Sequence, residues 1–130
     1  MIEELSRELG VADVTFMGFV PEAELPDYYS TATIMVFPSP CGFGLSSLEA
    51  MACGTPVIVA ATLDAPEFIG DAGVLVRPSD PDDLARAVVQ LLSDRELYRT
   101  LEEKGKERAR MFSWERMADE VLTLYRGLLK

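Results

Sequence analysis

The residues best suited to chemistry lie between Pro38 and Pro56, where a glycine-rich turn joins a short apolar run to a helix-like segment. Gly42 and Gly44 have no Cβ, so the backbone there can bend sharply and come close to a ligand. Residues 34–37 are apolar and partly β-branched, which predicts a buried parallel strand. A strand, a glycine turn and a helix in this order can present free backbone N–H groups to a phosphate.

Glu49 places a carboxylate one turn into the predicted helix 45–53, which Gly54 ends. Four residues share one helical face by their spacing, and the face is apolar except for the carboxylate: Leu45, Leu48, Glu49 and Ala52. An unpaired buried carboxylate is costly, so the sugar hydroxyls of a bound nucleotide would be suitable partners. Alternatively, Glu49 lies at the edge of this stripe and reaches water, because glutamate is rarely buried without a partner. The spacing leaves both interpretations open.

The segment from Pro38 to Pro56 resembles the donor-site signature of the retaining GT-B glycosyltransferases, the glycosyl transferases group 1, and the block from Phe43 to Pro56 is its most specific part. The resemblance covers nearly the whole chain, because further landmarks follow in the family's order. These are Gly18-Phe19-Val20, Tyr28-Tyr29, Pro66-Glu67, Gly70-Asp71-Ala72-Gly73 and Phe112-Ser113-Trp114-Glu115.

The resemblance implies an enzyme that moves a sugar from a nucleotide-diphosphate sugar to an acceptor hydroxyl with retention of configuration, with no cofactor and no obligatory metal. It implies that the backbone of Gly42, Phe43, Gly44 and Leu45 meets the donor sugar and the distal phosphate. Glu49 would bind the ribose hydroxyls, and the loop Gly18, Phe19 and Val20 would approach the base. The ring of Phe43 could equally be a plug in the core.

The chain departs from the family's signature at Cys41, where the family has its first glutamate, beside the transferred sugar. A thiol supplies no fixed negative charge unless its pKa falls well below its ordinary value of about 8.5. The resemblance therefore supports nucleotide binding more firmly than turnover, and Cys41 is a doubtful replacement for a catalytic residue.

Composition excludes several other functions. The net charge of −10 and the pI near 4.4 argue against nucleic acid or an anionic membrane as a partner. No apolar run approaches the roughly 20 residues that span a bilayer, and the first residues do not form a signal peptide, so we expect a cytoplasmic protein. With no histidine, the chain cannot assemble a Cys–His or Ser–His pair, and its two cysteines alone do not make a zinc site.

The order of elements predicts an α/β fold, a Rossmann-like parallel sheet of about four strands flanked by helices. The strands are predicted at 14–17, 34–37, 57–60 and 74–76. Helices are predicted at 2–10, 21–32, 45–53, 66–70, 81–92, 93–110 and 114–130. Asp80 and Pro81 form a strong helix start, whereas Pro26 is expected to split its helix.

Residues 1–130 are expected to form a single truncated nucleotide-sugar-binding domain, the incomplete C-terminal half of a GT-B fold. The resemblance covers only about the later two-thirds of the family's second domain, so the acceptor-binding domain and the first two strands of the donor domain are expected to be missing. In the family's 3-2-1-4-5-6 sheet order those strands lie between 14–17 and 34–37. Either the two segments pair directly or another chain supplies the strands. We therefore expect self-association, which a monodisperse monomer in light scattering would contradict.

The segment 113–130 is predicted to be a C-terminal amphipathic helix with one apolar face: Trp114, Met117, Val121, Leu124, Tyr125 and Leu128. This face either packs on the chain's own core or forms an exposed contact patch. The resemblance implies that this helix crosses back onto the first domain.

Two other functions remain open. One is a non-catalytic fragment or nucleotide-binding module without transferase activity, which the missing half and Cys41 favour. The other is a dinucleotide-binding domain, since residues 42–47 give Gly-x-Gly-x-x-Ser and Asp64 follows about 20 residues later. The third glycine of that motif is absent, and a comparison of NAD with UDP and GDP binding would separate the two nucleotide classes.

Overall fold

The computed structural model describes residues 2–39, 44–62 and 64–128, and its centre is a parallel sheet of three strands. The strands are β1 (Met35–Phe37), β2 (Val57–Ala60) and β3 (Val74–Val76), in the order β1-β2-β3. Met35 lies opposite Val57, and Ile58 lies opposite Val74. The middle strand, β2, is buried along its whole length, as its unbroken apolar sequence predicts.

The predicted α/β fold is confirmed, but the strand expected at 14–17 is absent. Residues 14–17 have no regular structure, and Val14, Phe16 and Met17 are all exposed. A β-strand is stabilised by hydrogen bonds to a neighbouring strand. Within the described residues, β1 pairs only with β2, so its outer edge has no strand beside it. The prediction failed because 14–17 finds no partner strand among the described residues.

Helices surround the sheet, and their bounds follow the predicted segments closely. They are α1 (Ile2–Glu8), the 3-10 helix η1 (Glu22–Glu24), α2 (Leu25–Thr31), α3 (Leu45–Ala52), α4 (Ala65–Ile69), α5 (Pro81–Ser93), α6 (Arg95–Arg110) and α7 (Trp114–Leu128). Pro26 lies in the first turn of α2, where a missing N–H costs nothing, and it separates this helix from η1.

Aspartates set the ends of α5 and α6. Asp80 accepts a hydrogen bond from the backbone N–H of Asp83 at 2.9 Å, which confirms the predicted cap. Asp94 ends α5 and begins α6, because its carboxylate accepts hydrogen bonds from the N–H groups of Glu96 and Leu97. One residue therefore joins two long helices.

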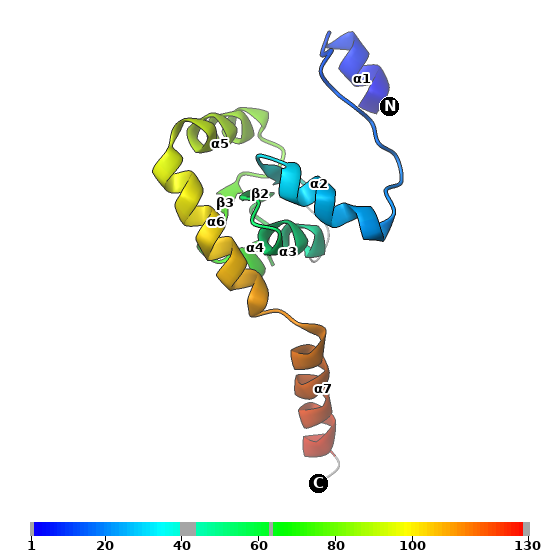
Figure 1. Ribbon diagram of the computed structural model, residues 1–130, viewed down its shortest axis with the longest axis vertical. Coiled ribbons are helices and arrows are strands. Elements are labelled where there is room, and N and C mark those ends of the chain that lie inside the picture. The colour runs from blue at the N-terminus through cyan, green and yellow to red at the C-terminus, as the bar shows by residue number, and fades with distance from the viewer. Residues whose placement is uncertain (1, 40–43, 63, 129–130) are drawn as a thin grey trace.

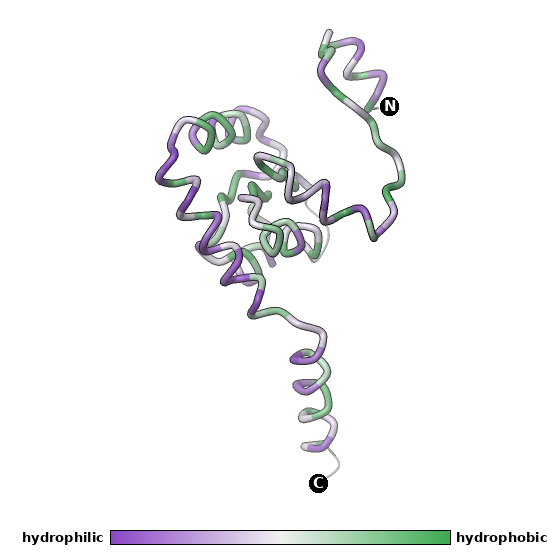
Figure 2. Tube along the Cα trace, viewed as in Figure 1, coloured by the Kyte–Doolittle hydropathy of each residue, from purple (hydrophilic) through white to green (hydrophobic). Residues whose placement is uncertain are grey.

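The core has two parts, one on each face of the sheet. Val57 and Val59 point to one face and pack in a cluster with Met51 of α3 and Phe68 of α4. Ile58 points to the other face and packs in a second cluster: Val76, Ala87, Leu91 and Leu101. The alternation along β2 thus gives three layers, with α3 and α4 on one face and α5 on the other (Figure 1). The strands are the hydrophobic centre of the trace, whereas α6 is largely hydrophilic (Figure 2).

The two ends of the chain leave this body. Figure 1 shows α1 and α7 projecting away from the layers at opposite ends of the molecule. Neither helix has a buried residue among those described. The apolar face of α7 is exposed, with Trp114 at 67% and Leu128 at 79%, so the expectation that it packs on the chain's own core is wrong. Self-association through this face stays a prediction.

Across the described residues, none of the helices combines the length and the apolar character needed to cross a membrane.

Candidate donor-nucleotide site

Helix α3 is the next described element after β1, and Gly44 is the residue that caps it. Gly44 has φ +73°, a left-handed conformation that favours glycine, and its carbonyl accepts hydrogen bonds from the N–H groups of Ser47 and Leu48 at 2.9 and 3.2 Å. A Cβ at Gly44 would lie 2.1 Å from Cε2 of Phe68. The glycine is therefore needed for packing between α3 and α4, a reason that the sequence did not suggest.

The first turn of α3 contains a buried hydroxyl with no protein partner among the described residues. Ser47 is fully buried, and its Oγ makes no hydrogen bond there. The first turn of a helix also has N–H groups without intrahelical acceptors and a partial positive charge. This end of α3 can therefore interact favourably with an anion.

The buried side of α3 differs from the predicted one. The buried residues are Ser47, Leu48, Ala50 and Met51, whereas Leu45, Glu49 and Ala52 are exposed. The predicted stripe is thus wrong except for Leu48. The helix packs against α2, α4, α6 and two strands. Its buried side combines the large Leu48 and Met51 with the small Ser47 and Ala50, and small residues are weak signals of hydrophobicity.

Glu49 is exposed, but it does not simply point into water. The hydroxyl of Tyr29, on α2, donates a hydrogen bond to Oε2 of Glu49 at 3.1 Å. Burial raises the pKa of Tyr29 above its usual value, a side-chain hydrogen bond with Ser46 lowers it, and the hydrogen bond to Glu49 raises it. The hydroxyl therefore keeps its proton at neutral pH. The carboxylate is held by one oxygen and can accept further hydrogen bonds from a ligand.

The structure places the remaining predicted residues as follows. Cys41, Gly42 and Phe43 lie outside the described residues, whereas Gly44, Leu45 and Glu49 lie together on α3. Gly18 has φ +64°. Phe19 is 91% exposed and Val20 is half-buried, so the structure does not pack Phe19 into a site.

Sequence reasoning missed Tyr29 as a member of this site. The Tyr28-Tyr29 pair was visible as a landmark, but nothing in the sequence indicated that Tyr29 contacts a carboxylate 20 residues later. That contact depends on how α2 packs against α3.

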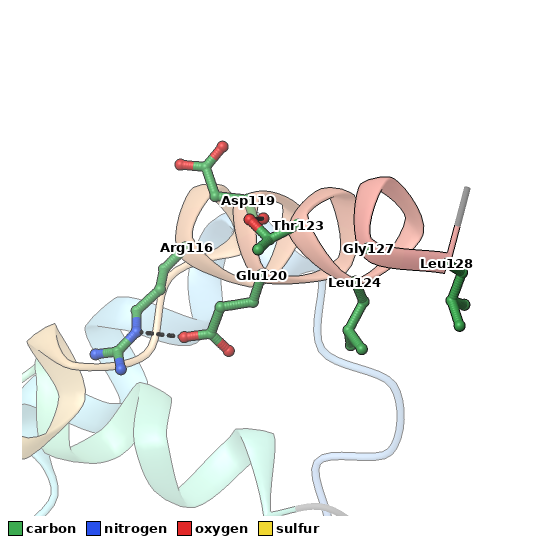
Figure 3. A pocket seen from close by; sticks show the side chains of 7 residues that line it. All are labelled: Arg116, Asp119, Glu120, Thr123, Leu124, Gly127 and Leu128. Atoms are coloured by element: carbon green, nitrogen blue, oxygen red, sulfur yellow. Dashed lines mark hydrogen bonds and ion pairs between the residues drawn. The ribbon is translucent and has the colours of Figure 1, made fainter. Parts of the chain in front are cut away.

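A hollow elsewhere on the molecule lies along α7 (Figure 3). Its lining comes from that helix alone: Arg116, Asp119, Glu120, Thr123, Leu124, Gly127 and Leu128. Arg116 and Glu120 form an ion pair of 2.9 Å along it. Because one exposed helix forms the whole lining, this hollow is not part of the site on α3.

In the described part of the chain, no group of three or more Cys, Asp or Glu side chains is placed to hold a metal ion.

The three-layer body has a parallel sheet between helices, and a glycine caps the helix that follows β1 in the described residues. The family model described as glycosyl transferases group 1 matches residues 1–94, and the chain belongs to this family. It is 36% identical over 116 residues to the O-antigen chain mannosyltransferase B of Escherichia coli, covering 88% of this chain and 30% of that protein. The chain thus spans about a third of the length of such relatives.

Solved structures agree. The C-terminal domain of a glycosyl transferase group 1 family protein from Francisella tularensis is 31% identical, with a TM-score of 0.74 over 85% of this chain and 59% of that one. The Anabaena protein HepE, solved in complex with UDP and glucose, has a TM-score of 0.87 and is 23% identical, covering 97% of this chain and 35% of that one. At this level of sequence identity, the similarity to HepE shows a shared fold only. The chain corresponds to part of the C-terminal domain of a GT-B enzyme, and the family decides against a dinucleotide-binding domain.

Proposed function

We propose that the chain is the donor-binding part of a glycosyltransferase that moves a sugar from a nucleotide-diphosphate sugar to an acceptor hydroxyl, with retention of configuration. One observation supports this most strongly. The first turn of α3, capped by Gly44, is followed one turn later by the exposed carboxylate of Glu49, which Tyr29 holds in place.

The two parts of this site suit the two ends of a nucleoside diphosphate. The N-terminal end of α3 has a partial positive charge, which stabilises the diphosphate as it leaves the sugar. Glu49 accepts hydrogen bonds from the ribose hydroxyls. The backbone of residues 42–45 meets the donor sugar and the distal phosphate, and residues 18–20 approach the base.

Residues 1–130 act as one donor-binding unit, with the helix 113–130 at its end. Because the chain spans about a third of its relatives, the acceptor site belongs to sequence outside it. Cys41 provides no fixed charge where the family has a glutamate, which favours the second candidate function, a nucleotide-binding module without transfer activity. A cytoplasmic location and the absence of nucleic-acid partners stay predictions.

Isothermal titration calorimetry tests nucleotide binding. The chain is titrated with UDP, GDP, ADP and NAD, together with the variants Glu49→Ala and Glu103→Ala. Glu103 is an exposed glutamate on α6 and serves as the matched control. We expect one diphosphate to bind, with affinity at least about tenfold weaker in Glu49→Ala and unchanged in Glu103→Ala. Binding of none of the three diphosphates, or an unchanged affinity in Glu49→Ala, would contradict the proposal.

Transfer is tested separately with the longest natural form of the protein. If the chain descends from an active transferase, Cys41→Glu increases the rate of sugar transfer, because it restores the charge beside the transferred sugar. If the transfer rate stays the same or falls, the cysteine at position 41 is not what limits catalysis.

A further inference from the structure

Glu49 and Tyr29 come from different helices, and their contact fixes a side chain that would otherwise move freely. Glu49 is exposed on α3, and among the described residues its carboxylate has one hydrogen bond, from Tyr29. The hydroxyl of Tyr29 holds Oε2 at 3.1 Å. The other oxygen, Oε1, remains available to accept hydrogen bonds.

Tyr29 is itself held on both sides. Its ring packs against the core cluster that contains Met51, and its backbone carbonyl accepts a hydrogen bond from Oγ1 of Thr55. Thr55 follows the end of α3, so α2 is tied to this end of the helix that bears Glu49.

The adjacent tyrosine makes no comparable contact. Tyr28 is 41% exposed, and within the described part of the chain its hydroxyl makes no hydrogen bond. Tyr29 differs, because its hydroxyl donates a hydrogen bond to the carboxylate on α3. The hydroxyl at position 29 therefore acts between the two helices and not within α2.

We infer that Tyr29 is a positioning residue: it orients Glu49 so that the carboxylate meets the ribose hydroxyls of a nucleoside diphosphate. This inference rests on the proposed function. The ordered carboxylate loses less conformational freedom when the nucleotide binds, and it distinguishes ribose from a sugar without hydroxyls. Removing the Tyr29 hydroxyl should thus weaken only the part of the affinity that the ribose contributes.

The test is a double-mutant cycle in which one change removes a hydroxyl from the protein and the other removes the ribose hydroxyls from the ligand. Tyr29→Phe keeps the ring and removes the hydroxyl, and Tyr28→Phe is the matched control. Each variant and the wild type are titrated with the diphosphate among UDP, GDP and ADP that binds most tightly, and with its 2′,3′-dideoxy analogue. Thermal unfolding is followed in parallel to confirm that each variant folds.

We expect Tyr29→Phe to bind the ribonucleotide about three- to tenfold more weakly and the dideoxy analogue with unchanged affinity. Tyr28→Phe should match the wild type on both ligands. In a Glu49→Ala background, Tyr29→Phe should have no further effect. If Tyr29→Phe does not fold, Tyr29→Met, which also lacks the hydroxyl, replaces it. Its loss of affinity should again be confined to the ribonucleotide.

Two outcomes overturn the inference alone. In the first, Tyr29→Phe binds the ribonucleotide as well as the wild type does. In the second, it loses affinity equally for both ligands, which indicates a purely structural role. A wild type that binds no diphosphate overturns the proposed function as well, so the two failures are distinguishable.

Discussion

Large apolar side chains are buried in the body of the molecule but exposed at its two ends. In the body, Ile58 and Leu91 are 0% and 1% exposed. At the ends, Phe19 and Leu128 are 91% and 79% exposed. The apolar spacing of α7 is as regular as that of α5, but only α5 has a sheet to cover. An amphipathic pattern thus predicts a helix, whereas burial also requires a surface for that helix to cover.

Truncating one large side chain in each region should give the largest difference in the free energy of unfolding. Ile58→Ala opens a cavity in the fully buried middle strand and should lower the free energy of unfolding by about 3–4 kcal/mol. Leu124→Ala on α7 should change it by less than about 0.5 kcal/mol. Urea unfolding followed by circular dichroism measures both. Comparable losses would show that α7 is packed in solution.

Two glycines with similar backbone conformations give the next comparison. Gly44 and Gly10 have φ +73° and +66°, but a Cβ at Gly44 meets the ring of Phe68, whereas a Cβ at Gly10 meets nothing within 4 Å. We expect Gly44→Ala to cost about 3 kcal/mol, from backbone strain and overpacking together. Gly10→Ala should cost about 1 kcal/mol or less. Equal unfolding midpoints for the two variants would contradict the packing of α3 against α4.

Helix caps allow a smaller test. Asp94 caps α6 in the body, and the Oγ of Ser113 accepts a hydrogen bond from the N–H of Arg116 at 3.1 Å at the start of α7. Asp94→Ala should lower the free energy of unfolding by about 1 kcal/mol. Ser113→Ala should reduce helical content but leave the cooperative unfolding midpoint unchanged, because α7 has no buried residue. A shifted midpoint in Ser113→Ala would count against independent behaviour of α7.

The smallest effect concerns pH. The backbone N–H of Arg77 and then the side chain of Arg86 lower the pKa of Asp83 from its ordinary value. A lowered pKa in the folded state gives stability that is present above the unfolded pKa of about 3.9 and is lost as the pH falls through the folded value. Acid titration of the unfolding midpoint below pH 4 should therefore be shallower in Asp83→Asn. An identical slope would show that the ion pairs of Asp83 contribute nothing.

Local signals in the sequence predicted the elements of the body well. Asp80 and Pro81 mark the start of α5, Pro26 separates η1 from α2, and the apolar run 57–60 forms the buried middle strand. These features depend on residues that are neighbours in the chain, so they can be predicted from one sequence alone.

Features that depend on distant residues could not be predicted. The apolar segment 14–17 resembles a strand, but the part of the chain that the structure describes offers it no strand to pair with. The buried side of α3 includes Ser47 and Ala50, whose small side chains allow close packing and are weak signals of hydrophobicity. The hydrogen bond from Tyr29 to Glu49 joins two helices, and only their packing brings the two side chains together.

The contact between Gly44 and Phe68 has a consequence for how selection acts on this family. Because the fold itself rejects a side chain at Gly44, descendants that lose all nucleotide binding should still retain this glycine. Glu49 is exposed and the hydroxyl of Tyr29 bonds its carboxylate, so under the proposed function both should vary once the ligand is no longer used. A glycine in the signature therefore records ancestry, whereas the tyrosine–glutamate pair would record continued use.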